Sequence, residues 1–182
     1  MSKIVSLLKA YGAFVRLPWQ TALSGREKVW FCLYEPRDER RLRARLADFA
    51  MVTKEAGHDW CRFDVTTAFE EWMAAQEYRE GYFAEPEFIA PALDDFLDGL
   101  AESLGQVLDT AESDAVVALV GVGALFGIAR VSALIERVSE RIRGRLVVFF
   151  PGTREGSNYR LLDARDGWSY LAVPIEAEGR TA

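Results

Sequence analysis

The pattern of hydrophobic and polar residues is most distinctive between residues 115 and 152. Two short apolar runs, AVVALV at 115–120 and LVVFF at 146–150, show no polar alternation. Such runs are typical of strands that are covered on both faces, as in a parallel sheet between two layers of helices. A glycine-bearing turn and an amphipathic helix separate the two runs, and Pro151 and Gly152 end the second. The stretch therefore predicts a βαβ unit.

Periodicity upstream predicts more elements of the same kind. Apolar residues at helical spacing predict an N-terminal helix that ends before Pro18. Another helix is expected from Asp38, which would cap its first amides, to Gly57. Two further strands and a long amphipathic helix are expected, in that order, at 28–34, 60–65 and 89–108.

The C-terminal quarter predicts antiparallel structure. Residues 151–156 are expected to form a loop at the carboxyl end of the fourth strand, where ligands of open parallel sheets bind. Strands at 158–163 and 168–173 would pair across the Asp166–Gly167 turn, and the tail from Ile175 onward is expected to fray. The prediction is a single α/β domain over 1–182: a mostly parallel, Rossmann-like sheet flanked by helices, with a C-terminal antiparallel hairpin.

Charge and composition narrow the functional class. The chain has 182 residues and a formal net charge of -6, so an average face repels phosphate and nucleic-acid binding needs a segregated basic patch. The candidate patch is the arginine-rich stretch Arg37–Arg45, although Asp38, Glu39 and Asp48 interleave with it and favour an ordinary solvated helix face. A DNA-contacting subunit remains an alternative. No signal peptide and no membrane span are indicated, so a cytoplasmic protein is expected.

Candidate catalytic chemistry is sparse. His58 is the only histidine and has no second histidine with which to build a metal site. Cys32 and Cys61 fall inside expected strands, where cysteine usually acts as a small buried hydrophobe. The carboxylates of the 89–108 helix region lie on its polar side and are expected to be solvated. No catalytic residue, metal site or cofactor is therefore predicted.

The turn Gly121–Gly127 is the one candidate nucleotide site. A glycine turn between a strand and a helix can hold phosphate on its backbone amides. The phosphate-loop motif would need a lysine, but Ile128 follows Gly127. The dinucleotide motif would need glycine where Phe126 stands. A nucleotide-binding regulatory subunit remains an alternative. The other explanation for these glycines is that they let the chain turn tightly at the edge of the sheet.

The stretch 69–87 is aromatic and acidic. It covers a sheet edge or forms a docking surface, because aromatic residues dominate the energetic hot spots of protein interfaces. Trp72 and Tyr78 are the candidate docking residues.

The order of these motifs resembles the BrxB family, a small component of bacteriophage-exclusion (BREX) systems. The resemblance is carried by VVALVGVGALF, RVSALIERV and VVFFPG, then by Gly156 and NYRLL, with VWFCLYEPRDERRLRARLADF upstream. It covers about residues 26–174. It implies an anti-phage defence role without catalysis, as a scaffold that binds a PglZ-type protein and other components encoded beside it. The positions that match the family pattern, and are candidates for docking or conformational roles, are Gly121, Gly123, Arg130, Pro151, Gly152 and Gly156.

Overall fold

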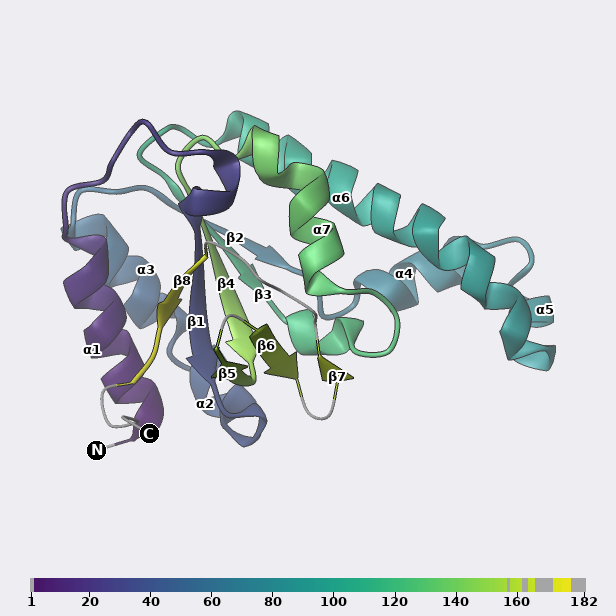
Figure 1. Ribbon diagram of the computed structural model, residues 1–182. Coiled ribbons are helices and arrows are strands. Elements are labelled where there is room, and N and C mark those ends of the chain that lie inside the picture. The colour runs from purple at the N-terminus through teal and green to yellow at the C-terminus, as the bar shows by residue number, and fades with distance from the viewer. Residues whose placement is uncertain (1, 157, 162–163, 166–171, 178–182) are drawn as a thin grey trace.

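A five-stranded sheet forms the centre of the protein, shown in Figure 1 as a computed structural model. The structure describes residues 2–156, 158–161, 164–165 and 172–177. The strand order is β2-β3-β4-β1-β8, and every neighbouring pair is parallel. The strands are β1 (Val29–Tyr34), β2 (Trp60–Asp64), β3 (Val116–Val120), β4 (Arg145–Pro151) and β8 (Val173–Ile175). The predicted α/β class with a parallel sheet is confirmed.

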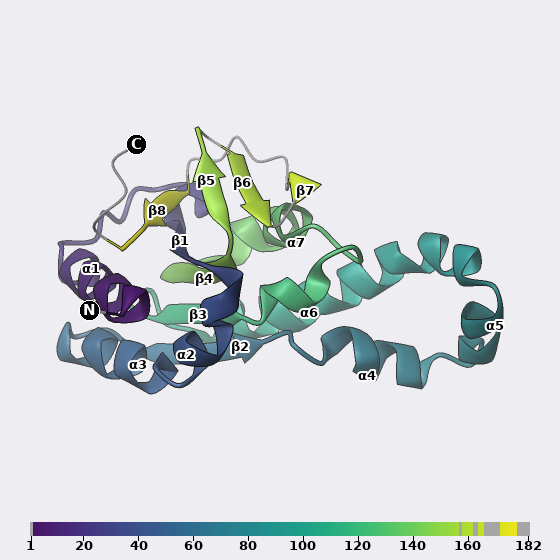
Figure 2. The same cartoon turned by 90° about the horizontal axis from the view of Figure 1, so that it is seen from below.

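Helices cover both faces of this sheet (Figures 1 and 2). Helices α1 (Lys3–Val15) and α3 (Leu46–Glu55) lie on one face, and α6 (Leu93–Thr110) and α7 (Val131–Val138) lie on the other. The remaining helices are short: α2 (Glu39–Arg43), α4 (Ala68–Ala75), α5 (Arg79–Ala84) and the 3-10 turns η1 (Gly25–Lys28), η2 (Pro36–Asp38), η3 (Pro86–Ala92), η4 (Val122–Leu125) and η5 (Ser139–Arg141).

The central strands explain why their sequences lack polar alternation. In β1, Phe31 and Leu33 pack toward α6 and α7, while Trp30 and Cys32 pack toward α1 and α3. All six residues of β1 are buried, as are all residues of β3 and β4. Because successive side chains point to opposite faces, a strand between two helical layers must be apolar throughout. The edge strand β2 is only partly buried and alternates.

The predicted βαβ unit is confirmed as β3, α7 and β4. The return from α7 to β4 runs through Gly144, where an added Cβ would lie 2.0 Å from the carbonyl oxygen of Ala115. The backbone just before β3, at Ala115, therefore lies directly against the backbone just before β4, at Gly144. Only glycine permits so close an approach.

The single helix predicted over 38–57 is wrong, because α2 and α3 are separate helices with a break at residues 44–45. Asp38 does not cap with its side chain. Its carboxylate is buried and instead accepts a hydrogen bond from Arg41 at 2.8 Å. The predicted end is confirmed, since Gly57 follows α3 with φ +87°, the left-handed conformation common after helices.

The C-terminal region forms a separate small antiparallel sheet. It contains β5 (Thr153–Glu155), β6 (Asn158–Leu161) and β7 (Ala164–Arg165) in that order. The loop predicted at 151–156 is therefore largely wrong, because Thr153–Glu155 pairs with β6. Most of the strand predicted at 168–173 and its turn at 166–167 lie outside the described residues. The expected fraying at Ile175 is also wrong, because β8 joins β1 in the main sheet and buries Ile175.

Ion pairs join the polar side of α6 to α7 and to η5, the turn that follows it. Arg137 contacts Asp98 at 2.7 Å, and Arg141 contacts Glu102 at 2.9 Å and Asp109 at 2.6 Å. These carboxylates stay largely exposed, as expected, but Asp98, Glu102 and Asp109 also pair with arginines from α7 and η5. No helix among the described residues is long and apolar enough to cross a membrane.

Candidate functional site

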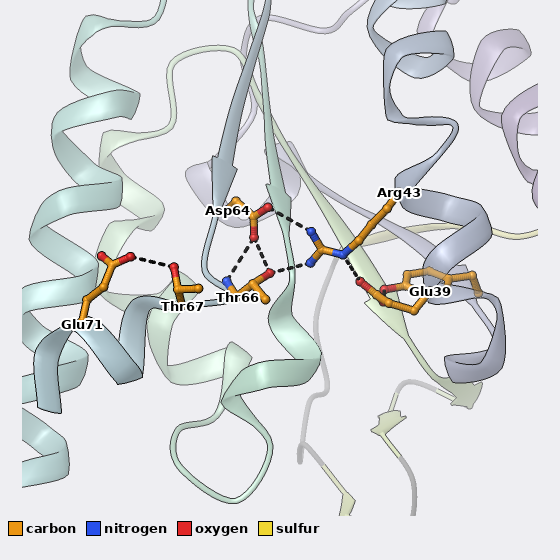
Figure 3. Close-up of polar contacts among 7 residues, drawn as sticks. Glu39, Arg43, Asp64, Thr66, Thr67 and Glu71 are labelled. Atoms are coloured by element: carbon orange, nitrogen blue, oxygen red, sulfur yellow. Dashed lines mark hydrogen bonds and ion pairs between the residues drawn. The ribbon is translucent and has the colours of Figure 1, made fainter. Parts of the chain in front are cut away.

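Polar side chains gather where β1, β2 and β3 end, at the carboxyl edge of the sheet (Figure 3). Asp64 is the last residue of β2. One of its carboxylate oxygens accepts a hydrogen bond from the amide of Thr66 at 3.1 Å and another from the Thr66 hydroxyl. The other oxygen accepts from Arg43 Nη1 at 3.1 Å. Arg43 lies in α2, so Asp64 joins the end of β2 to the segment that follows β1.

Arg43 is the centre of this polar cluster. Besides Asp64, its Nε donates to Glu39 Oε1 at 2.8 Å, and its Nη2 donates to the Thr66 hydroxyl. The hydroxyl of Tyr34, at the end of β1, donates to the same Glu39 carboxylate. We call Tyr34, Glu39, Arg43, Asp64 and Thr66 the arginine cluster.

The protonation states of the arginine cluster suit a structural role. Burial by itself would raise the pKa of Asp64, but hydrogen bonds from Thr66 and the Arg43 charge outweigh it and hold that pKa below its usual range. Burial, and then the hydrogen bond to Glu39, raise the pKa of Tyr34. The carboxylate is therefore ionised and the phenol protonated near neutral pH. Neither group has the near-neutral pKa that general acid or base catalysis favours.

Gly121 packs directly against the arginine cluster. It follows β3 with φ +81°. An added Cβ would lie 2.3 Å from the Thr66 hydroxyl oxygen and 2.8 Å from Asp64 Oδ1. Gly121 is thus a position where both conformation and space require glycine.

The other family-pattern positions do not all lie together. Gly123, in η4, faces the Pro151 ring, whose Cγ would lie 3.2 Å from an added Cβ. Gly152 is buried where the chain enters β5, and an added Cβ would lie 2.0 Å from the carbonyl oxygen of Arg160. Arg130 is exposed at the start of α7 and Gly156 is exposed in the β5–β6 turn. The structure thus brings Gly121, Gly123, Pro151 and Gly152 to the carboxyl edge and leaves Arg130 and Gly156 at the surface.

The Gly121–Gly127 turn has little of the geometry of a phosphate site. The 3-10 turn η4 follows Gly121 directly, and α7 begins only at Val131. The amides of an α-helix N-terminus, which would attract phosphate, are therefore absent from this described turn. The ionised Asp64 beside Gly121 also repels an anion.

The arginine-rich stretch Arg37–Arg45 is largely paired with acids. The arginines at 37, 41, 43 and 45 contact the carboxylates of Glu35, Asp38, Glu39 and Asp48, respectively. This mixed surface is what the interleaved sequence predicted, and it weakens the case for DNA contact.

The other candidate residues are in packed surroundings. The His58 ring stacks on Trp19, with 3.7 Å between ring centroids. Its Nδ1 lies 3.0 Å from the carbonyl oxygen of Asp114. Cys32 is buried in β1 and Cys61 half-buried in β2, and both are free thiols. Among the residues the structure describes, no group of three His, Cys, Asp or Glu side chains could hold a metal ion.

A pocket lies beside the arginine cluster, between α4, α6 and the end of β2. Its volume is about 470 Å³. Its walls are aromatic and aliphatic, including Phe63, Trp72 and Phe96, and its polar lining includes Glu71 and Asp64. The Thr67 hydroxyl donates to Glu71 Oε1 at 2.7 Å, as Figure 3 shows. The sequence indicates the aromatic stretch but not this pocket. One wall comes from α6, whose first lining residue, Phe96, lies 24 positions after Trp72 in the chain.

Residues 68–98 project away from the sheet as α4, α5, η3 and the start of α6 (Figure 2). We call this segment the acidic arm. It contains nine of the chain's 28 acidic residues and one of its 22 basic residues. Nine acidic residues and one basic residue give the acidic arm a net charge of -8, while the whole chain has a net charge of -6. The rest of the protein therefore carries a slight excess of positive charge.

The two predicted docking residues differ in their placement on the acidic arm. Trp72 is half-buried against Phe69 and Phe96, with ring centroids 5.8 and 5.5 Å away. Tyr78 is 59% exposed and contacts the ring of Tyr82. Trp72 therefore supports the fold and lines the pocket, whereas Tyr78 is available at the surface.

The chain matches a known protein family. The family model described as BREX protein BrxB matches residues 63–175, more than half of the chain. This range includes Asp64, the pocket, the acidic arm and the βαβ unit. Comparisons with curated proteins and with solved structures give no match.

Proposed function

Because the chain belongs to the BrxB family, and is therefore a component of a BREX anti-phage defence system, we propose that it acts without catalysis. Its role is that of a scaffold or adaptor that binds other BREX proteins. The partner we propose is the PglZ-type protein.

The observation that carries this proposal is the composition of the acidic arm. Six large hydrophobic side chains are exposed among the described residues, and Tyr78, Phe83 and Phe88 of the acidic arm are three of them. Exposed aromatic residues gathered on one projection are typical of protein interfaces. The arginine cluster supports the same conclusion, since its side chains bond to one another and hold the sheet edge together.

Co-expression with the PglZ-type protein tests the proposal. The tagged chain is purified together with the PglZ-type protein, and the sample is passed through size-exclusion chromatography at micromolar concentration. We expect one peak that contains both proteins, because a complex with a dissociation constant well below micromolar remains associated during the run. Elution as two separate peaks would refute the PglZ-type partner.

The same experiment with the other BREX proteins tests the adaptor role more broadly. An adaptor binds at least one of them. If each of them elutes separately from this chain, the adaptor proposal fails as a whole.

A further inference from the structure

The pocket beside α4 has the chemistry of a site for a basic side chain. Its walls include the rings of Phe63, Trp72 and Phe96, and the exposed residue Glu71 also lines it. An aromatic wall attracts a cation and packs against the methylene stem of lysine or arginine, while a carboxylate binds the charged end. In the part of the chain that the structure describes, no basic side chain pairs with Glu71.

The acidic arm extends this chemistry over a larger surface. Within the described residues, several of its carboxylates have no basic partner: Glu70, Glu77, Glu85, Glu87 and Asp95. The exposed fractions of Phe83 and Phe88 are 65% and 49%. Acidic and aromatic side chains thus alternate along one projection. Unpaired negative charge favours a positively charged partner over a neutral or acidic one.

We propose that the acidic arm and its pocket form the docking site for a basic, amphipathic segment of a partner protein. One lysine or arginine of that segment enters the pocket between Trp72 and Glu71. Apolar side chains of the segment pack on Phe83 and Phe88. This inference rests on the proposed adaptor function and adds to it the surface and the chemistry of the partner.

Charge reversal at the pocket is the direct test. Glu71→Lys places a cation in the lining of the pocket, and Glu71→Gln removes the charge with little change of shape. The matched control is Glu140→Lys, because Glu140 is exposed on η5, outside the acidic arm, and has no ion pair among the described residues. All three variants change exposed side chains, so thermal unfolding should show that they fold like the wild type.

Affinity for the co-expressed PglZ-type protein is then measured by titration. We expect Glu71→Lys to weaken binding about tenfold or more and Glu71→Gln by less, because the first adds repulsion to the lost attraction. Glu140→Lys should leave the affinity within about twofold of the wild type. If wild type and Glu71→Lys bind equally well, this docking site is wrong while the adaptor function stands.

A second probe covers the case in which the PglZ-type protein does not bind. It is a synthetic amphipathic helix with leucine on one face and lysine and arginine on the other, compared with a scrambled peptide of the same composition. The docking site predicts tighter binding of the amphipathic peptide and its loss in Glu71→Lys. Equal binding of the two peptides, or binding that Glu71→Lys does not weaken, overturns the inference separately from the partner's identity.

Discussion

Replacing Gly121 with alanine should destabilise the protein through two separable causes. The first is conformational, because φ +81° places alanine in the left-handed region at a cost of about 1–2 kcal/mol. The second is steric. The new methyl group would lie 2.3 Å from the Thr66 hydroxyl oxygen and 2.8 Å from Asp64 Oδ1, so it must displace the hydrogen bonds between these two residues.

The size of the steric cause follows from those hydrogen bonds. A hydrogen bond to a charged group contributes about 1.5–3 kcal/mol when it is well buried, and the partial exposure of Asp64 reduces this to about 1–2 kcal/mol. The total is about 3 kcal/mol, or about 6–12 °C in melting temperature for a chain of this size. Urea unfolding measures the loss, and the slope m should stay unchanged, because the compactness of the folded and unfolded states is the same.

Gly127→Ala is the matched control for the conformational cause. Gly127 has φ +76°, but nothing lies within 4 Å of an added Cβ, so this variant should lose only about 1–2 kcal/mol. The double variant Gly121→Ala with Thr66→Ala removes the nearest obstacle and should lose less than the sum of the two single variants. Equal losses for Gly121→Ala and Gly127→Ala, or strictly additive losses in the double variant, would refute the packing of Gly121 against the arginine cluster.

Three other predictions follow from the site. Trp72→Ala should lower the free energy of unfolding by about 2 kcal/mol, because it removes the packing of the indole ring against Phe96. Tyr78 is exposed, so Tyr78→Ala should lower that free energy by less than about 1 kcal/mol. Chemical denaturation measures both losses, and equal losses would contradict the different placement of the two residues. ATP, GTP and a dinucleotide should not raise the melting temperature, although a ligand at a hundred times its dissociation constant would add about 2.7 kcal/mol; a clear shift would revive the nucleotide alternative. The pKa of Asp64 is lower in the folded protein, so its ionisation stabilises the fold fully above the unfolded pKa of about 3.9 and progressively less as pH falls through the folded value. Asp64→Asn should therefore flatten the acid side of a plot of stability against pH. An unchanged plot would show that the pairing of Asp64 contributes nothing to stability.

Local pattern was sufficient for most elements of the core. The apolar runs at β3 and β4 predicted buried parallel strands, because a strand between two helical layers exposes no polar face. Gly57 predicted the end of α3, because the left-handed turn after a helix favours glycine. The errors fall where local signals compete. Aspartate is a common helix-capping residue, but the carboxylate of Asp38 binds Arg41 instead. Ile175 lies near the end of the chain, but it is buried because β8 pairs with β1, more than 140 residues earlier in the sequence.

The candidate site was predicted only in part, for a related reason. The aromatic and acidic stretch is visible in sequence, and so are the glycines of the turn after β3. The arginine cluster is not, because Arg43 and Asp64 belong to different elements and neither is unusual in its own segment. Their contact depends on β2 lying at the edge of the sheet, next to β3, so that the carboxyl ends of both strands meet the segment after β1.

The sequence by itself determined the α/β class, the burial of the central strands, the βαβ unit and the family. These properties depend on periodicity and on short-range residue chemistry, which every segment carries within itself. Only the tertiary structure decided the strand order, the pairing of Arg43 with Asp64, the binding of arginines from α7 and η5 to α6, and the pocket between α4 and α6. Each of these joins residues from separate elements, so their contacts exist only after the sheet has placed those elements side by side.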